Sequence, residues 1–200
     1  MDLVSRDVQG SVGLLTAVVV YGLALGGVFS LVFAGVYGRV RPATPMRTSI
    51  GLAATTFVAL YFVPFLKYPA NPPAVGRPET IGVRTELYLA MVAISVLAAI
   101  YAAWLSRRLT PALGADRALL IAIAVYLAVV LGGGLLLPGV NEVPDGFPAV
   151  ALWNFRVAAA GIQAITWTTI GLVFGFLAGR ALDRAAARRP VNARVTAADS

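Results

Sequence analysis

Five long apolar runs, free of aspartate, glutamate, lysine and arginine, constrain the fold of this chain more than any other feature of its sequence. A transmembrane helix needs roughly 20 apolar residues to cross a hydrocarbon core of about 30 Å, and each run approaches or reaches that length. The chain is 59% hydrophobic and only 12% charged, unlike a soluble domain. The sequence therefore predicts an all-α, polytopic transmembrane helix bundle with five spans, at about residues 12–37, 48–66, 87–105, 118–137 and 157–178.

The basic residues are distributed unevenly between the loops, and this asymmetry predicts an orientation. Of the 16 basic residues, 11 lie between the first two spans, between the third and fourth, and from residue 180 onward. Lysine and arginine are enriched in cytoplasmic loops, so the N-terminus is expected outside and the C-terminus in the cytoplasm of a plasma-membrane protein. The net charge of +7 is then explained by membrane topology, and the expected partner is the lipid bilayer and not nucleic acid. Residues 1–180 form one transmembrane domain, and residues 181–200 form a basic tail, expected to be disordered or a frayed amphipathic extension.

Two proline-rich loops, residues 63–76 and 137–150, follow the second and fourth spans and are both predicted to lie outside. Their prolines recur at nearly constant offsets, which hints at a parallel repeat of the kind found in transporters. Proline also recurs at helix ends for purely local reasons. Both interpretations stay open.

The only acidic cluster that directly follows a span contains Asn141, Glu142 and Asp145. Carboxylate and amide oxygens suit hard or borderline divalent cations, so these residues are candidates for a weak metal site. The structural alternative is that Asp145 opens a turn with Gly146 while Glu142 pairs with a neighbouring base. Cysteine and histidine are absent, which leaves no thiolate or imidazole ligand in this chain.

Five further residues around the outer loops are expected to line or brace an entrance vestibule. Lys67, the only lysine, either pairs with a loop carboxylate or snorkels at the membrane surface. Trp153 and Arg156 are expected to anchor the helix at the membrane interface. Pairing with the acidic cluster is a secondary role for Arg156. Tyr68 and Asn71 complete the set.

Polar and small residues inside the spans have two interpretations each. Gln163 and Thr166 share one helix face and either line a polar path or bond another helix. Glycines in residues 22–27 and 171–179 permit close helix approach, to a neighbour in the same chain or to a partner subunit.

The chain resembles the predicted cobalt transporter subunit family, CbtA, as it appears in actinobacteria. The resemblance covers residues 3–179 and is carried by residues 3–9, 64–73, 141–144 and 152–157. It implies a polytopic membrane protein assigned to cobalt uptake beside a small single-helix subunit, CbtB, whose histidine-rich end supplies metal ligands. The family pattern also has a transmembrane helix upstream of residues 5–9, which this chain lacks. A late start and a short N-terminal tail that translocates with the first span are the two explanations.

The leading functional hypothesis is a membrane subunit for uptake of a divalent metal, cobalt in the first place, with the outer loops as a cation vestibule. Co²⁺ or another divalent cation would be cargo, with no permanently bound cofactor. A non-transporting scaffold or assembly subunit is the alternative. An embedded enzyme is the weakest hypothesis, because no nucleophile accompanies the charged loop residues. Association into a homo-oligomer is a further possibility.

Overall fold

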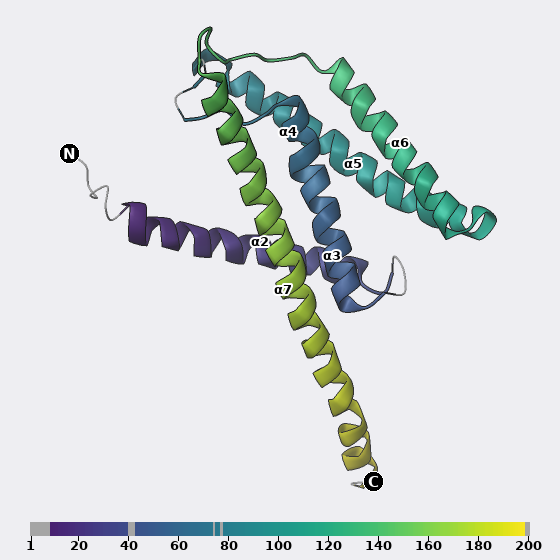
Figure 1. The fold of residues 1–200 in the computed structure, drawn as a ribbon. Coiled ribbons are helices and arrows are strands. Elements are labelled where there is room, and N and C mark those ends of the chain that lie inside the picture. Colours follow the sequence, from purple (N-terminus) through teal and green to yellow (C-terminus); the bar gives the residue numbers. More distant parts are fainter. Residues whose placement is uncertain (1–8, 40–42, 74, 77, 199–200) are drawn as a thin grey trace. The chain divides into compact units, whose positions relative to one another are not determined.

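The structure, a computed structural model, describes residues 9–39, 43–73, 75–76 and 78–198, and throughout these ranges it contains helices and no strands (Figure 1). Five of its helices are long and apolar enough to span a membrane, which confirms the predicted all-α fold and the five spans. Residues 3–8 of the segment that resembles CbtA, and the topology residues Arg41 and Arg77, lie outside the described residues. The spans cover Gly10–Val36, Pro45–Lys67, Ile81–Leu113, Ala115–Leu136 and Ala149–Arg188.

Several spans combine more than one helical element, and the long helices extend beyond their apolar runs. Helix α5 begins six residues before the predicted residue 87, and α7 continues from the fifth span into the basic tail. A single glycine, Gly114, separates α5 from α6 with a φ of 78°, a left-handed conformation that glycine adopts readily. The elements are η1 (Gln9–Gly13), α2 (Leu14–Val36), α3 (Pro45–Thr56), η2 (Phe57–Phe62), α4 (Val63–Lys67), η3 (Pro78–Thr80), α5 (Ile81–Leu113), α6 (Ala115–Leu136) and α7 (Ala149–Ala198).

The second span changes its hydrogen-bonding register before Pro64. Element η2 is π-helical, and the backbone N–H of Val63 bonds the carbonyl of Val58, five residues earlier. Pro64 has no N–H, so the carbonyl of Leu60, four residues before it, loses its usual α-helical donor. The hydroxyl of Tyr88 on α5 donates to that carbonyl at 3.3 Å. A neighbouring helix thus compensates for the proline, and the span continues to Lys67.

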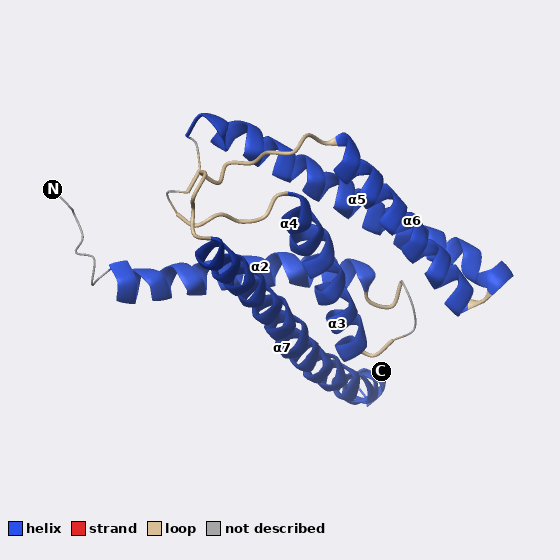
Figure 2. Cartoon of the chain, turned by 45° about the horizontal axis from the view of Figure 1, so that its top comes forward, coloured by secondary structure: helices blue, strands red, loops and turns tan. Residues whose placement is uncertain are grey.

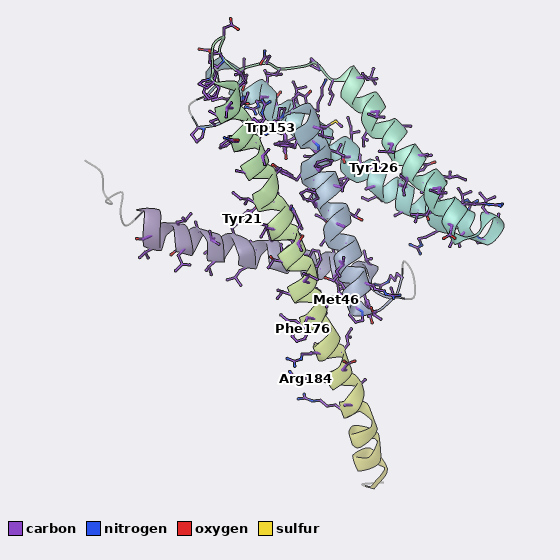
Figure 3. The ribbon with its side chains drawn as sticks, in the orientation of Figure 1. Tyr21, Met46, Tyr126, Trp153, Phe176 and Arg184 are labelled. Carbon is purple, nitrogen blue, oxygen red and sulfur yellow. The ribbon has the colours of Figure 1, made fainter. Side chains whose placement is uncertain are left out.

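The chain divides into two compact units, and the first contains residues 1–50 and 170–200. Here the first turns of α3 pack closely against α7, where Figure 3 labels Met46. The hydroxyl of Ser49, fully buried, donates to the carbonyl of Gly171 at 2.7 Å. Gly175 has no side chain to separate the helices, since a Cβ there would lie 3.1 Å from the Cα of Met46. Glycines 22, 26 and 27 of α2, by contrast, have no such neighbour within 4 Å.

The second unit contains residues 51–169, and α5 and α6 run side by side within it (Figure 2). The hydroxyls of Ser95 and Tyr126 form a hydrogen bond of 2.8 Å between these two helices. Such a pair satisfies two polar groups inside an apolar bundle. A small core beside it links the helices to the loop that follows α4, and it is made by Tyr68, Met91, Ala98 and Val130.

Candidate functional site

Two loops of the second unit meet although about 70 residues separate them in sequence: the α4–α5 loop (residues 68–77) and the α6–α7 loop (residues 137–148). The hydroxyl of Tyr68, at the end of α4, donates to the carbonyl of Pro138 at 2.7 Å. Tyr68 is only 4% exposed, and this burial raises the pKa of its phenol. The phenol therefore stays a hydrogen-bond donor and joins the two loops.

The carboxylate of Glu142 forms the second connection between these segments. Its Oε2 accepts a hydrogen bond from Nη1 of Arg84 at 2.9 Å, in an ion pair whose glutamate side chain is only 3% exposed. Its Oε1 accepts a hydrogen bond from the hydroxyl of Thr80. Gly76, with a φ of 140°, packs against the same carboxylate, since a Cβ there would lie 3.3 Å from Oε2. Both carboxylate oxygens are therefore engaged, as a buried charge requires.

Two arginines from different helices hold the α4–α5 loop by its oxygens. Arg84 of α5 donates from Nη2 to the carbonyl of Pro69 at 2.6 Å. Arg156 of α7 donates from Nε to the carbonyl of Ala70 at 3.3 Å and from Nη2 to the amide oxygen of Asn71 at 3.2 Å. Three successive residues of the loop therefore each supply an oxygen to a guanidinium group. The multiple donors of arginine suit this arrangement.

An open cavity of about 340 Å³ lies beside Arg84. Four of its eight lining residues are aromatic, and one of them, Tyr61, has a buried hydroxyl without a hydrogen-bond partner among the described residues. The lining residues are Tyr61, Phe65, Tyr68, Ala70, Ile81, Arg84, Thr85 and Tyr88.

The three residues of the predicted acidic cluster differ in burial. Asn141 and Asp145 are exposed, whereas Glu142 is buried. The amide oxygen of Asn141 accepts a hydrogen bond from the backbone of Val143 at 3.4 Å. Asp145 lies in a turn with Gly146, as the structural alternative predicts. No group of three or more His, Cys, Asp or Glu side chains gathers in the part of the chain that the structure describes.

The remaining predicted residues lie around this site in different settings. The ammonium of Lys67 lies 5.9 Å from the ring centroid of Tyr68, and the ion pair of Glu142 is formed by a different base. Trp153 is exposed near the start of α7 (Figure 3). Gln163 is half-buried, while the hydroxyl of Thr166 bonds the carbonyl four residues earlier in its own helix.

Sequence reasoning did not single out Arg84 and Thr80, although both contact Glu142. Two signals could have found them. Arg84 is one of only five basic residues on the side predicted to be outside, and it follows Thr80 by four residues, the spacing that places two side chains on one helix face.

Comparison with known proteins agrees with this architecture. The family model described as "Probable cobalt transporter subunit (CbtA)" matches residues 1–179. No curated protein and no solved structure gives a match. The family match confirms the resemblance carried by the loop segments, and together with five apolar helices it establishes a multi-pass membrane protein. The chain belongs to the CbtA family of transporter subunits.

Proposed function

We propose that this protein is the membrane subunit of a divalent cation uptake system, with Co²⁺ as its cargo and the two joined loops as the entrance on the outer face. The family membership and the five spans support this function. The excess of basic residues in the opposite loops and the tail supports an external N-terminus and a cytoplasmic C-terminus. Because the chain has no histidine, a small histidine-rich single-helix partner would complement it.

The observation that carries the proposal is the neutralised Glu142. Among residues 137–148 only Glu142 and Asp145 are charged, and Arg84 cancels the charge of Glu142. Asp145 therefore supplies the net negative charge of the α6–α7 loop, and it is exposed. A fixed exposed carboxylate raises the local cation concentration, and the nearby amide of Asn141 adds an oxygen donor. Capture at such a site is weak, which lets the ion move on.

Beyond the outer loops, two polar side chains of α7 are candidates for the part of the cation path inside the membrane. Gln163 is half-buried on α7, and Thr166 follows it by three residues on the same face. An amide in an apolar span has a role either toward another helix or toward water. We assign these two residues to the inner part of the path.

The test is the rate of Co²⁺ uptake by cells that express Asp145→Asn. The substitution keeps the shape of the turn and removes the charge. We expect the initial rate at low Co²⁺ to fall by up to about thirtyfold, because one carboxylate charge about 4 Å from a divalent ion contributes ~2 kcal/mol in water. Saturating Co²⁺ should restore most of the rate, and the amount of protein in the membrane should not change.

Glu86→Gln is the matched control, because Glu86 is an exposed carboxylate on α5 outside the two loops. Its uptake should match wild type. Equal losses in both variants would mean that general surface charge, and not the loop, is responsible. Unchanged uptake by Asp145→Asn with reduced recovery of partner proteins would favour a scaffold subunit instead.

A further inference from the structure

The guanidinium of Arg84 is hydrogen-bonded to oxygens of kinds that also bind metal ions. It contacts the carboxylate of Glu142 at 2.9 Å and the carbonyl of Pro69 at 2.6 Å, and the hydroxyl of Thr80 adjoins the same carboxylate. Carboxylate, carbonyl and hydroxyl oxygens are the donors that hard and borderline divalent cations take. Arg84 is itself a cation, so this oxygen set already holds a positive charge.

The geometry makes Arg84 the exchangeable partner of Glu142. Thr80 covers one carboxylate oxygen and Gly76 packs against the other, while the Arg84 side chain is 26% exposed. Two nitrogens of one guanidinium bond the carboxylate of Glu142 and the carbonyl of Pro69, so both oxygens border the space that the guanidinium fills. Metal–oxygen bonds of about 2.0–2.6 Å would require these oxygens to move toward an ion that replaced it.

The cavity beside Arg84 gives the displaced guanidinium a second position. Four of its lining residues are aromatic, and aromatic faces attract a guanidinium. The guanidinium of Arg84 therefore pairs with Glu142 in this structure, and its side chain also borders the aromatic cavity.

We propose that Arg84 is an internal, tethered cation that occupies a divalent-cation site between uptake events. An incoming ion displaces Arg84 into the aromatic cavity and binds to Glu142, Thr80 and the carbonyl of Pro69. This step deepens the proposed function and rests on it for the identity of the cargo. Exchange replaces one positive charge by two beside a single carboxylate, which keeps binding weak and favours release.

Arg156 of α7 binds the same loop and provides the contrast. It holds the carbonyl of Ala70 and the amide oxygen of Asn71, with no carboxylate among its partners in the described structure. Neutral oxygens alone compensate a divalent charge poorly. Removal of Arg156 should therefore loosen the loop without creating a cation site.

The test is Mn²⁺ binding to purified protein, followed by the loss of the free Mn²⁺ electron paramagnetic resonance signal. Arg84→Gln removes the internal cation and leaves its oxygen partners. We expect this variant to bind Mn²⁺ about tenfold or more tightly than wild type, because the ion no longer breaks charge-assisted contacts. The double variant R84Q/E142Q and the single variant Arg156→Gln should show no gain. The proposal is wrong if R84Q gains no affinity or if the gain survives E142Q.

Wild-type protein offers a second readout that does not depend on how R84Q folds. Saturating Co²⁺ should alter the hydrogen–deuterium exchange of residues 137–148 in wild type and leave it unchanged in Glu142→Gln. Identical exchange with and without Co²⁺ in wild type would overturn the exchange step. The outcomes also separate the two proposals. If Asp145→Asn takes up Co²⁺ like wild type, the proposed function alone is contradicted. If R84Q binds Mn²⁺ no more tightly than wild type, only the exchange of Arg84 is contradicted.

Discussion

Gly175→Ala should destabilise the protein by about 1–2 kcal/mol, because Gly175 lies at a close contact between α3 and α7. An added Cβ would lie 2.9 Å from the sulfur of Met46, 3.1 Å from the Cα of Met46 and 3.1 Å from the Cβ of Ser49. The thioether can rotate away. The Cα of Met46 and the Cβ of Ser49 are fixed to the helix, so the two helices must separate by a few tenths of an ångström.

Three effects set the magnitude of this loss. Overpacking a tight contact costs about 1–3 kcal/mol. Separation also lengthens the hydrogen bond from Ser49 to the carbonyl of Gly171, 2.7 Å in the structure, and such a bond contributes about 0.5–1.5 kcal/mol. Alanine regains roughly 0.8–1.0 kcal/mol over glycine through its helix propensity. The steric and hydrogen-bond losses exceed the propensity gain, which leaves the net cost given above.

Gly179→Ala is the matched control, one turn further along α7. A Cβ at Gly179 would meet nothing within 4 Å, so only the propensity gain applies and stability should stay equal or rise slightly. The measurement is reversible unfolding in mixed micelles, with tryptophan fluorescence as the signal and the free energy of unfolding as the result. Equal unfolding free energies for the two variants would refute the close contact of α3 with α7.

Two further predictions concern the joined loops. Tyr68→Phe leaves the carbonyl of Pro138 without its donor and should cost about 1–2 kcal/mol in the same unfolding assay. Because burial raises the pKa of this phenol above 10.0, its contribution is full below pH 10 and is lost as pH rises through the raised value, so wild type should approach the variant only in stronger alkali. Gly76→Ala should lose about 1–2 kcal/mol, because alanine is strained at a φ of 140° and its Cβ would lie 3.3 Å from Oε2 of Glu142. Faster proteolysis of the α4–α5 loop would accompany that loss, and a variant as resistant as wild type would contradict it.

The spans could be predicted from sequence because five uncharged apolar runs of membrane length have few alternatives. The helix ends were less predictable. Helix α5 begins at Ile81, where Arg84 and Glu86 interrupt the apolar run, because a helix continues past the hydrocarbon layer wherever its backbone bonds remain satisfied. Hydropathy marks the limits of the apolar run, not those of the helix.

The candidate site was predictable in part. One of the two interpretations of Glu142 pairs it with a base, and the sequence offers Lys67 and Arg156 as candidates. The structure pairs it with Arg84 instead, which the chain path alone brings to the carboxylate. The same limit applies to the glycine pattern of residues 171–179, which permits close approach in two registers. Only the packing of α3 shows that Gly175 and the carbonyl of Gly171 lie against it.

The manner in which the arginines hold the α4–α5 loop has a consequence for protein engineering. Arg84 and Arg156 grip the loop largely through the carbonyls of Pro69 and Ala70, and every amino acid offers that carbonyl. The side chains at these positions can therefore be exchanged, by genetic drift or by design, while the anchor points persist. New ligand types, histidine among them, could be grafted beside a guanidinium clamp that is already in place, which makes this loop a natural starting point for altering ion preference.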